Sequence, residues 1–144
     1  EWCSEKTTEI GIERVSPLLC RYSERKEIKH ERIEKILISA MKQSQKAILP
    51  ILDQMIPFTQ FLKQDFDGRK FIAHCYEGEK LQLHETYKKG ENALILIGPE
   101  GDFSEQEVEQ AIKAGFEPIS LGQSRLRTET AALVACHTIH ALNW

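Results

Sequence analysis

The most informative segment for the fold class covers residues 93–104: Ala93-Leu94-Ile95-Leu96-Ile97-Gly98-Pro99-Glu100-Gly101-Asp102-Phe103-Ser104. Its first five residues form a continuous apolar run that ends at a glycine, which is typical of a strand covered on both faces, as in a parallel sheet. Its last residue begins a capping box with Glu107, which predicts a helix that ends at Gly115. The segment therefore predicts a strand, a glycine-containing loop and a helix.

Similar alternation of strands and helices extends over the rest of the chain. Strands are predicted at residues 14–20 (interrupted by Pro17), 47–52, 70–76, 93–97 and 118–121. Helices are predicted at residues 1–10, 30–46, 59–64, 105–115 and 129–142, the last of them capped by Thr128. Strands that alternate with helices predict the α/β fold class.

Length and composition limit the classes of protein to which the chain can belong. The chain has 144 residues, of which 41% are apolar and 28% charged, so we expect one globular domain over residues 1–144 and exclude a disordered tail, a collagen-like repeat or a coiled coil.

Since no apolar run approaches the roughly 20 residues that cross a bilayer, we expect a cytoplasmic protein without a membrane partner. The chain starts with Glu1 in what reads as the middle of a helix, so we expect it to be the tail of a longer protein.

Cysteine and histidine spacing argues against a metal site. The four cysteines, Cys3, Cys20, Cys75 and Cys136, contain no C-x-x-C pair, and the five histidines form no ligand pattern with them. We expect no metal and read the cysteines as reduced thiols.

Two glycine-containing loops are the candidates for chemistry. The loop at 98–104 follows a predicted strand, at the position where open α/β sheets bind ligands, although a tight turn without a ligand fits it as well. The loop at 121–130 also lies between a strand and a helix. There Arg127, close to Glu129, fits either a functional ion pair or anion contact, or a salt bridge that caps the helix.

Basic residues gather in one part of an otherwise acidic chain. The formal net charge is −3, yet residues 21–46 carry eight Lys or Arg against four Glu. This excess fits either a phosphate-facing patch, in which Arg21, Arg25, Lys26 and Lys29 are the candidate RNA-binding residues, or a solvated helix face with i,i+4 ion pairs.

Missing motifs narrow the function further. The sequence has no G-x-x-x-x-G-K-[ST], no G-x-G-x-x-G after an early strand and no G-x-S-x-G. P-loop hydrolysis of ATP or GTP, a Rossmann cofactor site and an α/β-hydrolase are therefore poorly supported.

The two loops together resemble a known family. LIGPEGDFSEQEV followed by ISLGQSRLRTETAAL, with KTTEIGIERVSPL and MKQSQKAILP before them, is similar to the bacterial small-subunit ribosomal RNA uridine-N3 methyltransferases of the SPOUT superfamily. The resemblance extends from Lys6 to Asn143. It implies a parallel sheet flanked by helices with a C-terminal trefoil knot, an exception to the rule that chains avoid knots. It also implies a homodimer whose substrate is small-subunit ribosomal RNA or the 30S subunit.

The resemblance further implies S-adenosyl-L-methionine as the cofactor, held by loop backbone. The cofactor-binding residues that it implies are Ala73, His74, Leu96, Ile97, Gly98, Pro99, Glu100, Gly101, Leu121, Gly122, Leu126, Arg127 and Thr130. Arg127 is the expected catalytic residue, which stabilises a uracil anion, and Glu129 or Glu100 orients it or accepts the proton.

The chain departs from the family at three points. Asp102 stands where the family commonly has a second glycine, and we expect its carboxylate at the N-terminus of the following helix. The family's N-terminal PUA-like RNA-binding domain and a first strand of the catalytic domain are expected to be missing. Two alternatives stay open: a SPOUT enzyme that modifies transfer RNA or another ribosomal position, and an RNA-binding module of this fold without catalysis.

Overall fold

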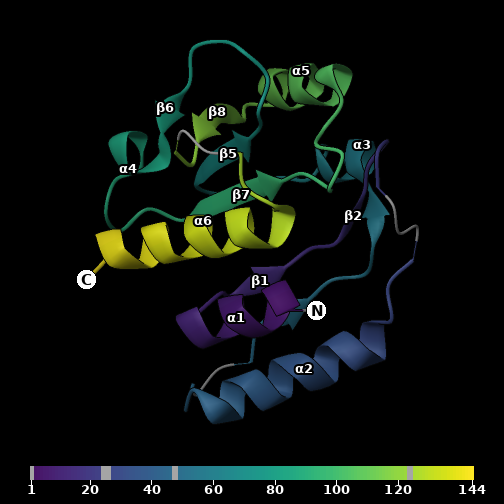
Figure 1. The fold of residues 1–144 in the computed structure, drawn as a ribbon, viewed down its shortest axis with the longest axis vertical. Coiled ribbons are helices and arrows are strands. Elements are labelled where there is room, and N and C mark those ends of the chain that lie inside the picture. The colour runs from purple at the N-terminus through teal and green to yellow at the C-terminus, as the bar shows by residue number, and fades with distance from the viewer. Residues whose placement is uncertain (1, 24–26, 47–48, 123–124) are drawn as a thin grey trace.

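The computed structural model describes residues 2–23, 27–46, 49–122 and 125–144, and it has the predicted α/β architecture (Figure 1). The helices are α1 (Trp2–Ile10), α2 (His30–Gln43), α3 (Phe58–Phe61), α4 (Leu83–Thr86), α5 (Glu105–Lys113) and α6 (Thr128–Leu142). The strands are β1 (Arg14–Val15), β2 (Leu18–Leu19), β3 (Ile51–Leu52), β4 (Ile56–Pro57), β5 (Arg69–Ala73), β6 (Leu81–Gln82), β7 (Ala93–Ile97) and β8 (Glu117–Ser120).

The main sheet contains four parallel strands in the order β6-β8-β5-β7. β5 lies at its centre, with Ile72 opposite Leu96 of β7 on one side and opposite Pro118 of β8 on the other. β8 is the last strand in the chain, yet it lies between β5 and β6. Because all four strands are parallel, their carboxyl ends meet at one edge of the sheet.

Both faces of this sheet are covered, as the apolar run at 93–97 predicts. Ile72 and Leu96 point into a core cluster with residues of α3 and α5, and Phe103 is fully buried there. The neighbouring residue Phe71 points to the opposite face, where it packs with Ala135 of α6 and with residues next to α4. Figure 1 shows α5 and α6 on opposite sides of the sheet. The alternation of side chains along a strand produces this two-sided burial.

Helix α5 begins with the capping box that the sequence predicts. The Ser104 hydroxyl accepts a 3.1 Å hydrogen bond from the Glu107 N–H, and the Glu107 carboxylate accepts a 2.8 Å bond from the Ser104 N–H. Both side chains are buried. The reciprocal bonds satisfy two N–H groups that a helix start otherwise leaves without partners.

The first half of the chain packs beneath the main sheet. Helix α1 contacts α6 on one side and α2 on the other, so that the three helices form successive layers (Figure 1). Two short parallel pairs, β1 with β3 and β2 with β4, connect segments within this part of the chain. Pro17 separates β1 from β2, which explains why the predicted strand at 14–20 forms two pieces with different partners.

The structure corrects several predicted elements. The strand predicted at 70–76 ends at Ala73, the helix predicted at 59–64 covers Phe58–Phe61, and the strand within 47–52 is limited to Ile51–Leu52, with 47–48 outside the described residues. The short elements β4, β6 and α4 were not predicted. They span two to four residues, too few for a hydrophobic period to show in sequence.

In the parts of the chain that the structure describes, no helix combines the length and the apolar character needed to span a membrane.

Candidate functional site

The first wall of the candidate site is the loop between β7 and α5. The Asp102 N–H donates to the Pro99 carbonyl over 2.8 Å, which closes a turn around Glu100 and Gly101. Asp102 has φ of +65°, in the left-handed region that favours glycine. The residue that departs from the family pattern therefore keeps a glycine-like backbone.

The Asp102 carboxylate ties this loop to the end of β5. Its Oδ2 accepts a 3.1 Å bond from the Cys75 N–H, and its Oδ1 accepts a 2.7 Å bond from the Phe103 N–H. We predicted that the Asp102 carboxylate lies at the N-terminus of the following helix, and this is only partly right. Its Oδ1 binds the N–H of Phe103, just before the N-cap residue Ser104, whereas its Oδ2 binds the segment after β5. Spacing along the chain does not reveal this contact, because Cys75 is distant in sequence.

Gly98 is required by close packing at the same place. A Cβ added to Gly98 would lie 3.1 Å from the Asp102 Oδ1, 3.1 Å from the Phe103 nitrogen and 3.2 Å from the Phe103 ring. A larger residue would require these neighbours to shift by a few tenths of an ångström. The start of the 98–103 loop is thus packed closely against its own end.

The second wall is the loop between β8 and α6, and it meets the first directly. The Thr128 hydroxyl donates a 2.8 Å hydrogen bond to the Gly98 carbonyl. The prediction that Thr128 caps α6 was wrong. Thr128 is the first residue of the helix, and the N-cap residue is Arg127, whose side chain makes no capping hydrogen bond. Its hydroxyl instead joins the two glycine-containing loops, which lie side by side as the sequence predicts.

The third wall is the segment that follows β5. Burial lowers the pKa of His74, and the nearby Lys80 cation lowers it further, whereas the Asp102 carboxylate raises it. Since the net effect lowers the pKa, the imidazole is neutral at pH 7. Its Nδ1 is buried without a hydrogen-bond partner in the structure. The Lys80 ammonium donates 2.8 Å hydrogen bonds to the carbonyls of His74 and Tyr76. These two bonds connect the end of the 74–80 segment with its beginning. Sequence reasoning missed Lys80, because a lone lysine in a loop carries no distinguishing signal.

The candidate cofactor-binding residues lie at the carboxyl edge of the sheet, and they differ in how far they are exposed to a ligand. Leu96 and Gly98 are buried, and the Leu96 side chain belongs to the core, so only its backbone is available to a ligand. The residues with partly exposed side chains are Ala73, His74, Ile97, Pro99, Leu121, Leu126 and Thr130. Gly101 and Gly122 are exposed, and a Cβ on Gly122 would meet no atom of the described residues within 4 Å. The described part of this edge is therefore uncrowded at Gly122.

The candidate catalytic side chains are not paired with one another. Arg127 and Glu100 are exposed, and none of the ion pairs among the described residues includes Arg127. Glu129 is partly buried in the first turn of α6. Burial raises the pKa of the Cys3 thiol on α1, and the charge of Glu129 raises it further. The structure thus leaves the Arg127 guanidinium available to an external group.

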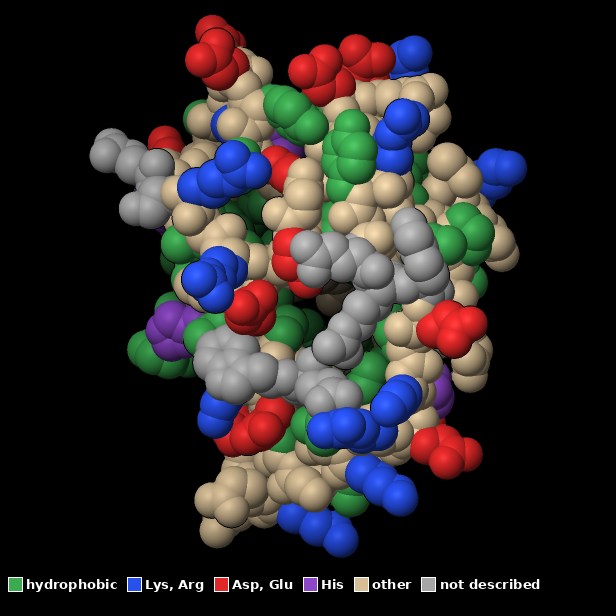
Figure 2. All heavy atoms as spheres, turned by 45° about the vertical axis from the view of Figure 1, so that its right-hand side comes forward, with side chains coloured by type: hydrophobic (Ala, Val, Ile, Leu, Met, Phe, Trp, Pro, Cys, Tyr) green, Lys and Arg blue, Asp and Glu red, His purple; other side chains and the backbone are tan. Residues whose placement is uncertain are grey.

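Of the candidate RNA-binding residues, the structure describes two. Arg21 and Lys29 are exposed, whereas Arg25 and Lys26 lie outside the described residues. On the face in Figure 2, Lys and Arg side chains are interspersed with Asp and Glu rather than gathered into one basic surface. A contact with RNA on this face would therefore depend on particular side chains and not on a uniform field.

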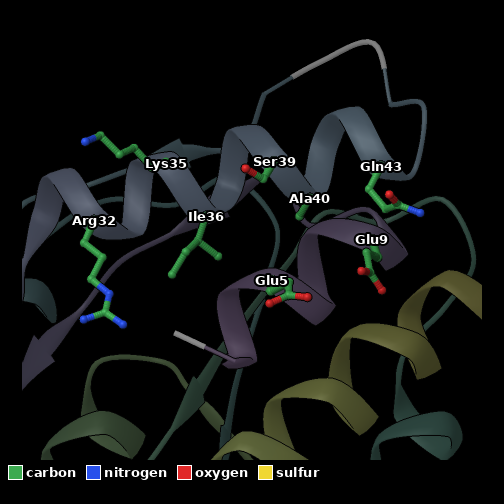
Figure 3. A pocket seen from close by; sticks show the side chains of 8 residues that line it. All are labelled: Glu5, Glu9, Arg32, Lys35, Ile36, Ser39, Ala40 and Gln43. Carbon is green, nitrogen blue, oxygen red and sulfur yellow. The ribbon is translucent and has the colours of Figure 1, made fainter.

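A separate groove of about 620 Å³ lies between α1 and α2 (Figure 3). Acidic Glu5 and Glu9 come from α1, and basic Arg32 and Lys35 come from α2. None of the predicted site residues lines it. The groove is therefore distinct from the site at the sheet edge.

The described residues include no group of three or more His, Cys, Asp or Glu side chains that could hold a metal ion. The arrangement at the sheet edge offers instead backbone donors and acceptors, a neutral imidazole and a guanidinium without an ion pair among the described residues. Such a set can hold a polar organic ligand and stabilise developing negative charge beside it.

Comparisons with known proteins agree with this chemistry. A family model described as RNA methyltransferase domain matches residues 1–140. A ribosomal RNA small subunit methyltransferase E from Rickettsia conorii is 31% identical over 138 residues, covering 94% of this chain and 56% of that protein.

Two solved structures share the fold over 99% of the chain. A probable rRNA methyltransferase from Porphyromonas gingivalis is 48% identical with a TM-score of 0.92, and 61% of its chain is covered. A ribosomal RNA small subunit methyltransferase E from Neisseria gonorrhoeae bound to S-adenosyl methionine is 29% identical with a TM-score of 0.88, and 60% of its chain is covered. This chain therefore spans less than two thirds of the length of these relatives.

Proposed function

The chain belongs to the RNA methyltransferase domain family, and on this premise we propose that it is the catalytic part of a methyltransferase acting on small-subunit ribosomal RNA. We propose S-adenosylmethionine as its methyl donor and N3 of one uridine as the acceptor. The names of the relatives support the substrate, and the S-adenosyl methionine bound by the Neisseria relative supports the donor. The observation that carries the proposal is the direct bond between Thr128 and Gly98, which brings both glycine-containing loops to one edge of the sheet.

The residues at this edge fit a nucleoside-containing cofactor. The orphaned Nδ1 of His74 and the backbone of the 98–103 loop supply polar groups, and the exposed Gly122 leaves room beside them. When bound, S-adenosylmethionine supplies an electrophilic methyl group. Loop backbone and the partly exposed aliphatic side chains would hold its adenine and ribose.

Arg127 acts on the uracil in this proposal. Uracil N3 carries a proton and becomes a good nucleophile only when that proton leaves, so the reaction requires stabilisation of the imide anion. The exposed Arg127 guanidinium donates to a uracil carbonyl oxygen as negative charge develops there. Glu100, on the neighbouring loop, or Glu129 orients Arg127 or accepts the N3 proton. Alignment of N3 with the methyl group supplies much of the remaining acceleration.

We also propose that the C-terminal part forms a trefoil knot. The position of β8 between β5 and β6 supports it, because the last strand enters the sheet between two strands that were formed earlier in the chain. The contact of Thr128 with Gly98 supports it further, since α6 starts against the loop that follows β7.

A homodimer and a preceding RNA-binding domain complete the proposal. Helix α6 is mostly apolar, and its residues 128–134 are only partly buried, so we propose that a second copy covers this part of the helix. A PUA-like domain before residue 1 would explain why the chain covers 56% to 61% of the relatives described above. Ultracentrifugation of the full-length protein tests the dimer, and a stable monomer would contradict it.

The decisive test of the function is the identity of the modified nucleoside. Ribosomal RNA from a strain that lacks the gene should lose one 3-methyluridine in the small subunit, and the purified full-length protein with S-adenosylmethionine should restore it. Loss of a methyl group from transfer RNA or from another ribosomal position would reassign the substrate. Failure to bind S-adenosylmethionine in calorimetry would indicate an RNA-binding module without catalysis.

A further inference from the structure

A short segment from the first half of the chain lies directly against the candidate site. A Cβ added to Gly101 would lie 2.9 Å from the Tyr22 Cβ, so the segment that follows β2 packs on the turn at 99–102. Tyr22 therefore lies directly against the loop after β7.

The backbone of this segment is anchored. The buried Glu107 carboxylate accepts a 3.1 Å bond from the Arg21 N–H in addition to its bond in the capping box. The Cys20 N–H donates a 3.0 Å bond to the Ser23 hydroxyl, and the Cys20 side chain belongs to the core. The side chains of Arg21 and Tyr22 thus project from a fixed backbone at the edge of the site.

These two side chains are of the kind that binds unpaired nucleotides. Tyr22 is 46% exposed, and the Arg21 guanidinium carbon lies 5.8 Å from the centre of its ring. Aromatic rings and guanidinium planes stack on splayed-out bases, while the arginine charge attracts the adjoining phosphate. The contact with Gly101 involves the Tyr22 Cβ, its carbonyl oxygen and the ring carbon Cγ, at the root of the side chain.

We propose that Arg21 and Tyr22 form a stacking platform for an unpaired nucleotide of the RNA, adjacent in the strand to the base that enters the site. This inference rests on the proposed function, since it takes RNA as the substrate. A base inside a paired region must leave its stack to reach a buried site, and its neighbour loses a stacking partner at the same moment. The platform replaces that partner and so favours the open form of the RNA.

The test compares RNA binding by the full-length protein and its Tyr22→Ala and Tyr22→Phe variants. Fluorescence anisotropy with a labelled single-stranded RNA oligonucleotide, and with the same sequence as a duplex, measures affinity. We expect Tyr22→Ala to weaken single-strand binding by about 5- to 100-fold, the range that loss of one base stack produces, and Tyr22→Phe to stay within about 2-fold of the wild type. Duplex affinity and the affinity for S-adenosylmethionine should not change.

Phe66 provides the matched control. It is 37% exposed and precedes β5, at the opposite edge of the sheet from the candidate site. Phe66→Ala removes a similar ring without removing the platform, and we expect it to leave RNA affinity unchanged. Should Tyr22→Ala not fold, ultraviolet crosslinking of the wild type to the RNA should label the peptide that contains Tyr22, and labelling elsewhere only would overturn the proposal.

The outcomes separate this inference from the proposed function. Equal single-strand affinity of Tyr22→Ala and the wild type, with methylation intact, overturns the platform alone. Weaker binding by Tyr22→Ala in a protein that methylates no RNA supports the platform and contradicts the proposed function.

Discussion

The Thr128 hydroxyl donates a 2.8 Å hydrogen bond to the Gly98 carbonyl, which connects residues 30 positions apart. This bond links the start of α6 to the loop after β7, so that the two glycine-containing loops share one edge of the sheet. A ligand held by both loops depends on that link.

Removing the Thr128 hydroxyl should therefore weaken cofactor binding. Thr128→Val keeps the shape of the side chain but loses a bond worth about 0.5–1.5 kcal/mol, so we expect the S-adenosylmethionine dissociation constant to rise about 2- to 10-fold in calorimetry. Thr128→Ser should restore most of the affinity. Thr138 also donates from its hydroxyl on α6, to the Val134 carbonyl, and Thr138→Val should have no such effect. Equal losses in both valine variants would argue for a general effect on the helix.

Asp102 should stabilise the fold through its backbone conformation as well as its bonds. Asp102→Ala loses the bonds to Cys75 and Phe103 and must hold φ near +65°, so we expect its free energy of unfolding to fall by about 1–3 kcal/mol in urea titration. Asp102→Asn keeps an acceptor and tolerates this φ, and should lose about 1 kcal/mol or less. Asp102→Gly should lie between them. A glycine variant as unstable as the alanine variant would show that the positive φ contributes nothing.

His74 should make stability depend on pH. Because burial, reinforced by Lys80, lowers its pKa in the folded state, the unfolded chain binds more protons at mildly acidic pH. The unfolding free energy should be constant above about pH 6.5 and fall as the pH drops through the ordinary histidine range towards the folded pKa. His74→Gln should flatten this slope in urea titrations at several pH values. His84→Gln, which removes an exposed histidine on α4, should keep the wild-type slope.

Three of the four thiols should differ in reactivity. Burial and the Glu107 charge raise the pKa of Cys20 to about 12, and burial raises that of Cys136 to about 11, whereas Cys75 is exposed. Because the thiolate is the reactive form, iodoacetamide should label Cys75 well before Cys20 or Cys136 in the folded protein. Mass spectrometry of the labelled peptides measures the order. Early labelling of Cys136 would mean that α6 opens in solution.

Arg127 should be needed for the chemistry more than for cofactor binding. Arg127→Ala should abolish methylation of the RNA while the affinity for S-adenosylmethionine stays within a few-fold of the wild type, because the guanidinium contacts the uracil in the proposed mechanism. Arg125, also exposed on the same loop, offers the matched control, and Arg125→Ala should retain methylation. Full methylation by Arg127→Ala would remove Arg127 from the mechanism.

Local chemistry explains which elements the sequence predicted. The strand at 93–97 and the start of α5 were predicted correctly because an apolar run and a capping box are complete within a few neighbouring residues. Elements without such a local signal were not predicted. An example is β6, whose two residues are extended because they pair with β8. The end of β5 at Ala73 was also misjudged, since hydrophobicity continues beyond the last residue that pairs.

The candidate site divides in the same way. Residue types along the chain predict that two glycine-containing loops follow parallel strands, because backbone conformation and strand burial follow from residue type. The contacts of Thr128 with Gly98, of Asp102 with Cys75 and of Tyr22 with Gly101 are visible only in the folded structure. These contacts join residues distant along the chain, and their geometry is set by the order in which strands enter the sheet, which no local pattern encodes.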